Sequence, residues 1–104
     1  MDREECRKVA VWLCNHSLKN TSYFVSEVYH DLCEYNQDNV FTEKMLSVFR
    51  ELTHNKNISE QQAKELLDTE IAKARQQISF WQENPMDTNA RFFRLKYKQI
   101  EWED

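Results

Sequence analysis

The sequence predicts an all-α protein, a small bundle of four to five helices, and three observations support that prediction. The 104 residues contain no glycine and a single proline, Pro85. An average chain of this length carries about seven glycines, which supply the positive-φ turns that tight hairpins and phosphate-binding loops need. In addition, apolar residues recur at helical spacing along most of the chain.

The first two helices are predicted over residues 3–18 and 22–35. Asp2, followed by Glu5, has the pattern of a capping box at the first helix start. Asn20 is expected to end this helix, because asparagine is second to glycine at the left-handed cap position. Each helix carries an apolar face, made by Cys6, Val9, Ala10 and Leu13 in the first and by Phe24, Val25, Val28, Tyr29, Leu32 and Cys33 in the second.

The next two helices have clear start signals. The third is predicted to begin near Thr42 and to end at the polar run 54–57. Ser59 and Gln62 match the S-x-x-Q capping box at the start of the fourth helix. No helix breaker follows for about 24 residues, a length of roughly 36 Å. The sequence therefore predicts one long helix near residues 60–83.

Apolar residues of this long helix follow heptad spacing for about two heptads: Leu67, Ile71, Ala74, Ile78 and Trp81. Packing within the chain is the favoured interpretation, because two heptads are too short to indicate a coiled coil. In the alternative interpretation the face is buried only between two copies of the chain. That homodimer face would consist of Ile71, Ala74, Ile78 and Trp81.

The fifth segment, residues 89–102, contains two competing periods. Phe93, Tyr97 and Ile100 share a helical face, whereas apolar and basic residues alternate as in a strand over residues 93–98. A helix is favoured, because no other segment could pair with this one as a strand. We expect residues 1–104 to form a single helical domain. Alternatively, residues 86–104 form a C-terminal arm that packs on the bundle or on a second copy.

Charge and cysteine content narrow the class of protein. The chain has 14 basic and 18 acidic residues and a net charge of −4, which disfavours strong binding to nucleic acid or to an anionic membrane. No apolar stretch has the length of a transmembrane helix or the flanks of a signal peptide. The three cysteines are odd in number and lie in apolar stretches, as reduced thiols do. We therefore expect a cytoplasmic protein with no membrane partner.

Four carboxylates share one side of the second helix if that helix extends far enough: Glu27, Asp31, Glu34 and Asp38. No lysine or arginine occurs between Lys19 and Lys44 to neutralise this acidic stripe locally. A solvated helix face is the ordinary interpretation of such charges. The functional interpretation is a docking surface for a partner protein with a basic surface, which a patch of one sign would steer into place.

The C-terminal segment carries the opposite charge. Its basic residues are interleaved with aromatic ones, and the candidate contact residues are Arg91, Arg94, Lys96, Lys98 and Tyr97. Aromatic and basic side chains together suit base stacking and phosphate contact. A helix that packs on the core with a basic outer face explains the pattern equally well.

The sequence lacks the common catalytic and metal-binding patterns. It has no P-loop, no G-x-S-x-G and no H-E-x-x-H. Cys14, His16, His30 and Cys33 are residue types that bind zinc, but Cys14 and His16 are two positions apart and point in different directions on a helix. We therefore predict no enzyme activity, no catalytic residue, no metal and no cofactor.

These observations favour a non-enzymatic protein-binding module. It would act as an inhibitor, immunity-type or adaptor protein through exposed helix faces that include the acidic stripe. The alternative is a small nucleic-acid-binding regulator that uses the basic and aromatic C-terminal segment.

Overall fold

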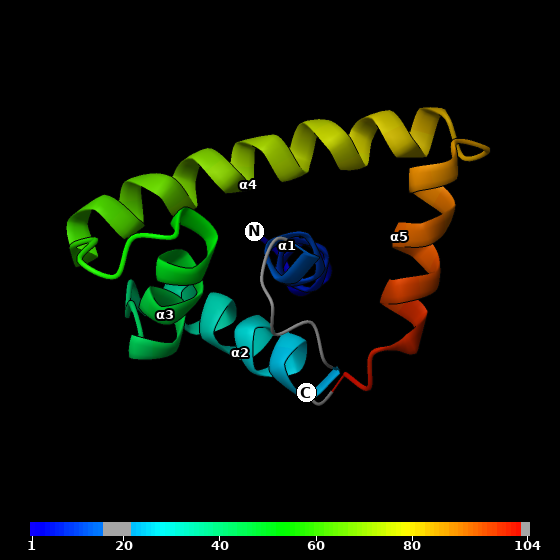
Figure 1. Ribbon diagram of the computed structural model, residues 1–104. Helices are drawn as coiled ribbons and strands as arrows, with labels where there is room; N and C mark the ends of the chain where they lie inside the picture. The colour runs from blue at the N-terminus through cyan, green and yellow to red at the C-terminus, as the bar shows by residue number, and fades with distance from the viewer. Residues whose placement is uncertain (16–21, 103–104) are drawn as a thin grey trace.

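The computed structural model describes residues 1–15 and 22–102, and within them it contains five helices and no strand (Figure 1). The all-α prediction is therefore confirmed. The helices are α1 (Arg3–Asn15), α2 (Ser22–Asp38), α3 (Glu43–Thr53), α4 (Glu60–Glu83) and α5 (Thr88–Gln99). The predicted end of the first helix, with its cap at Asn20, lies outside the described residues. The segment with two competing periods is a helix over most of its length.

Side-chain caps fix where the helices begin. The carboxylate of Asp2 accepts a hydrogen bond from the backbone N–H of Glu5 at 2.8 Å. The capping box at α4 is complete, because Ser59 and Gln62 each accept a hydrogen bond from the other's backbone N–H. At α5, the side chain of Asp87 accepts hydrogen bonds from the first turn. Two positions that other proteins often fill with glycine have left-handed backbones here, Asn39 (φ 57°) and His54 (φ 54°).

Helix α1 lies at the centre of the molecule, where Figure 1 shows it end-on with α2, α4 and α5 around it. Six of its 13 residues are buried: Cys6, Val9, Ala10, Val11, Leu13 and Cys14. Helix α2 runs beside it and contributes Val25, Val28, Tyr29 and Leu32 to the same core. The hydrophobic core is therefore organised around α1.

The long helix α4 connects the two ends of the bundle, with α3 at its start and α5 at its end (Figure 1). Ala74 is fully buried, and Ile71, Ile78 and Trp81 are half-buried against the core of the same chain. The apolar face of α4 therefore packs on the core of the same chain. A homodimer through these four residues stays a prediction.

The C-terminal segment packs back on the bundle. Ala90, Phe93 and Ile100 are buried, and the rings of Phe93 and Trp81 lie 4.8 Å apart, centroid to centroid. After α5 the chain returns toward α2, where the ring of Trp102 meets that of Tyr29 edge-on at 5.3 Å. This contact joins the end of the described chain to the core.

A polar contact joins α1 to α4 beside the core. The indole N–H of Trp12 donates a hydrogen bond to Glu70 Oε2 at 3.1 Å, and Lys73 Nζ lies 3.3 Å from Glu70 Oε1. Glu70 is only 8% exposed. A buried carboxylate is tolerated when hydrogen bonds and a nearby cation compensate for its lost hydration.

We predict that Glu70→Ala lowers the free energy of unfolding by about 1–3 kcal/mol, because it leaves the Trp12 N–H without its acceptor. Glu70→Gln keeps an oxygen in the same place and serves as the matched control, with a smaller loss. Urea unfolding followed by circular dichroism measures both values. Equal stability of the two variants would show that the hydrogen bond to Trp12 contributes nothing.

Candidate protein-binding site

The four carboxylates of the acidic stripe on α2 have different surroundings: two contact α3 or its N-cap, and two are exposed. Glu27 Oε1 lies 2.7 Å from Lys44 Nζ of α3, and Asp31 Oδ2 accepts a hydrogen bond from the hydroxyl of Thr42 at 3.0 Å. Thr42 is itself the N-cap of α3. These two carboxylates therefore attach α3 to α2, whereas Glu34 and Asp38 are exposed to solvent.

Burial of Asp31 raises the pKa of its carboxyl above the ordinary value, and the Thr42 hydrogen bond and the Lys44 charge offset only part of this effect. A carboxyl with a raised pKa binds a proton more tightly in the folded state than in the unfolded state. Ionised Asp31 therefore costs stability at neutral pH, and that cost disappears as the pH falls through its folded pKa.

The structure also separates the basic residues of α5. The guanidinium of Arg94 donates a hydrogen bond to the Pro85 carbonyl at 2.8 Å. Tyr97 is half-buried, with its ring 5.3 Å from that of Trp102. Arg91 and Lys98 are exposed and form no ion pair with any carboxylate among residues 1–15 and 22–102. Arg94 and Tyr97 are therefore engaged within the chain.

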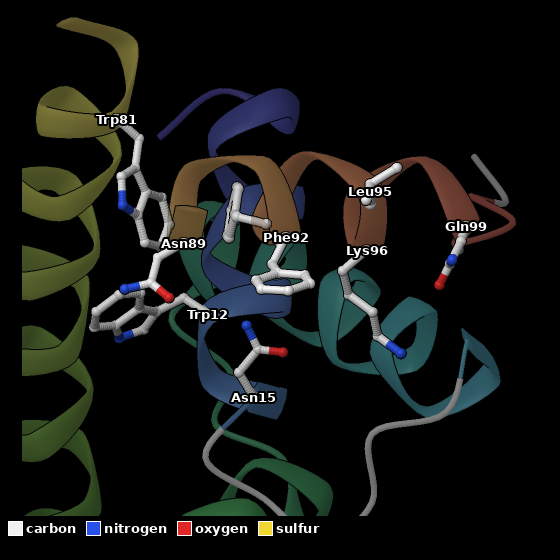
Figure 2. Close-up of a pocket in the computed structure, with 9 residues that line it drawn as sticks. Trp12, Asn15, Trp81, Asn89, Phe92, Leu95, Lys96 and Gln99 are labelled. Atoms are coloured by element: carbon white, nitrogen blue, oxygen red, sulfur yellow. The ribbon is translucent and has the colours of Figure 1, made fainter. Parts of the chain in front are cut away.

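Beside these residues lies a hollow of about 590 Å³ (Figure 2), lined mainly by apolar side chains. Phe92 and Leu95 are 65% and 56% exposed at its edge. Three helices supply the lining: α1 with Trp12 and Asn15, α4 with Trp81, and α5 with Asn89, Phe92, Phe93, Leu95, Lys96 and Gln99.

Aromatic contacts between helices build this hollow. The ring centroids of Trp12 and Trp81 lie 6.3 Å apart, and the ring of Phe93 also packs against that of Trp81. Residues of one helical face recur every three or four positions, and the face of α5 that turns to the core consists of Ala90, Phe93, Tyr97 and Ile100. Phe92 and Leu95 are not among these positions and therefore lie outside that face.

Further exposed apolar residues lie near the turn between α4 and α5. Met86 is 80% exposed and Phe80 is 49% exposed. Phe80 lines a second depression together with Trp12 and polar residues of α4. Soluble proteins seldom concentrate exposed apolar side chains in one region unless the region binds something.

The sequence did not identify this hollow. Neither Phe92 and Leu95 in the fifth segment nor Trp12 in the first helix belongs to a sequence motif that marks a binding site. One signal was present: the apolar residues of the fifth segment fit two periods, so they could not all lie on one helical face. Which helices would meet beside them was not encoded in any local pattern.

The cysteines and histidines do not form a metal centre in the part of the chain that the structure describes. No three or more His, Cys, Asp or Glu side chains gather there in a way that could hold an ion; His16 lies outside those residues. The three cysteines form no disulfide. Burial raises the pKa of both Cys6 and Cys14 to about 12, so their thiols are protonated, and weakly nucleophilic, at neutral pH.

No protein-family model matches the chain, and no curated protein or solved structure matches it either. Among the described residues, no helix is both long and apolar enough to cross a membrane.

We predict that Asp31→Asn raises the melting temperature at pH 7. The amide oxygen can still accept the Thr42 hydrogen bond, and no buried charge remains to be desolvated. The advantage should shrink as the pH falls toward the ordinary pKa of an aspartate, about 3.9. Thermal unfolding at a series of pH values measures it. An Asn variant that is less stable than the native chain at pH 7 would contradict the proposed cost of ionised Asp31.

Proposed function

We propose that this chain is a non-enzymatic protein-binding module, an inhibitor or adaptor, that holds a partner protein by its apolar side chains in the hollow between α1, α4 and α5. The observation that carries the proposal is the exposure of Phe92 and Leu95 beside Trp12 and Trp81. Covering a large apolar side chain is worth about 1.5–3 kcal/mol. Aromatic anchors in a pocket also dominate the energy of many protein interfaces.

A second surface for the same function lies on α2. Glu34 and Asp38 are exposed and remain available to a partner with a basic surface. Figure 1 shows the end of α2 beside α3, on the opposite side of the molecule from α5. Two separate surfaces of this kind suit an adaptor, whereas a simple inhibitor needs only one.

A nucleic-acid-binding regulator is the second candidate function, and one observation favours it. Phe92 is exposed next to the exposed Arg91, an arrangement that suits stacking of a base beside a phosphate contact. Fluorescence anisotropy with single- and double-stranded probes at low salt tests this function, because such binding weakens steeply as salt rises. Absence of binding at low salt would remove it.

We predict that affinity capture from the native host retains one partner protein in a stoichiometric complex. Replacing both Phe92 and Leu95 by alanine should weaken that complex at least about tenfold, since the partner loses two apolar contacts. Val40→Ala is the matched control, because Val40 is also an exposed apolar residue but lies between α2 and α3. Circular dichroism should be the same for all three proteins.

A second variant, Glu34→Lys with Asp38→Lys, tests the acidic surface in the same capture. Glu34 and Asp38 are chosen because they are exposed. Glu27 and Asp31 bind Lys44 and Thr42, so charge reversal at Glu27 or Asp31 would disturb the fold as well. Retention of the partner by both double variants, or the absence of any partner of the native chain, would contradict the proposed function.

A further inference from the structure

The charge around the hollow is unlike that of the rest of the molecule. Helix α5 carries Arg91, Arg94, Lys96 and Lys98 and no acidic residue. All 18 acidic residues of the chain lie outside it, together with the other ten basic residues. An acidic protein therefore presents its exposed apolar side chains on a basic helix.

Cations lie on both sides of the exposed apolar strip of α5, which consists of Phe92 and Leu95. On a helix, residues three and four positions apart are neighbours. Arg91 and Lys98 are accordingly the neighbours of Leu95, on the outer side of the strip. Lys96 is the corresponding neighbour of Phe92, and it lines the hollow itself, as Figure 2 shows.

We infer that the hollow binds an amphipathic helix of a partner protein, with acidic residues on both sides of its apolar stripe. This inference rests on the proposed function and specifies the partner's chemistry. The lining of α5 extends from Asn89 to Gln99, about three helical turns. Such a length accommodates apolar side chains at i, i+3 or i+4, and i+7, the usual pattern of a helix bound in a groove.

Charge complementarity argues against a second copy of this chain as the occupant. Pairing α5 with α5 would bring together the flanking cations of both copies, Arg91, Lys96 and Lys98, and like charges across an interface cost affinity. A nucleic-acid strand is also a poorer fit, because only one of the nine residues that line the hollow, Lys96, is charged. An acidic amphipathic helix would cover the apolar lining and place carboxylates beside the flanking cations.

The test uses two fluorescein-labelled helical peptides of about 16 residues with the same leucine stripe. One has glutamate on both sides of the stripe and the other has lysine in the same positions. Anisotropy at low salt should show at least about tenfold tighter binding of the acidic peptide, and the difference should shrink as salt is added. Replacing both Arg91 and Lys98 by glutamate should remove that preference, whereas Lys56→Glu, at an exposed lysine between α3 and α4, should not change it.

The indole N–H signals of the three tryptophans locate the bound peptide in ¹⁵N-correlated NMR spectra. Trp12 and Trp81 line the hollow, whereas Trp102 packs on Tyr29. The acidic peptide should therefore shift the Trp12 and Trp81 signals and leave the Trp102 signal in place. Sedimentation of the chain alone should show a monomer.

Several outcomes would overturn the inference: equal affinity for both peptides, no binding of the acidic peptide at millimolar concentration, a shift confined to Trp102, or a dimer closed through α5. Tighter binding through α5 to vesicles of anionic lipid or to single-stranded DNA would overturn it too. If captured partner is lost from the alanine variant of Phe92 and Leu95 while the acidic peptide fails to bind, the proposed function stands and only the acidic helix is wrong. If the native chain captures no partner, the proposed function fails as well.

Discussion

The burial of α1 is the constraint on which the rest of the structure depends. Six of its residues are at most 1% exposed, and each large apolar side chain so buried contributes about 1.5–3 kcal/mol. A single helix can be covered on several sides only by several other helices, and α2, α4 and α5 contribute to that cover. Helix α3 instead contacts α2 and α4 and is attached to α2 through Lys44 and Thr42.

The hollow follows from the way α5 completes this arrangement. Helix α5 is short, and few of its residues reach the core, among them Ala90 and Phe93. The rings of Trp12 and Trp81 hold the end of α4 beside α1, so the apolar residues of α5 that face away from the core border a recess between helices. A partner that covers Phe92 and Leu95 would extend the core outward from α5. Such a surface needs no strained loop, in agreement with the absence of glycine from the chain.

The sequence predicted the fold well because helix signals are local. Capping residues such as Ser59 and Asp87, and the apolar spacing of each helix, act within a few positions of one another. The candidate sites were harder to predict, since they depend on which helices meet. Lys44 neutralises Glu27 only because α3 folds back on α2, and no local pattern encodes that contact. The exposure of Leu95 similarly depends on where α1 and α4 end relative to α5.

Crosslinking from position 92 tests most directly whether the hollow beside Phe92 binds a partner protein. A photoreactive phenylalanine analogue placed at position 92 and irradiated in the native host should crosslink the chain to one protein. The crosslinked segment should be an apolar stretch flanked by aspartate or glutamate, and the same analogue at position 40 should not capture it. Crosslinks from position 92 to nucleic acid, to a second copy of the chain or to no macromolecule would contradict binding of a partner protein in the hollow.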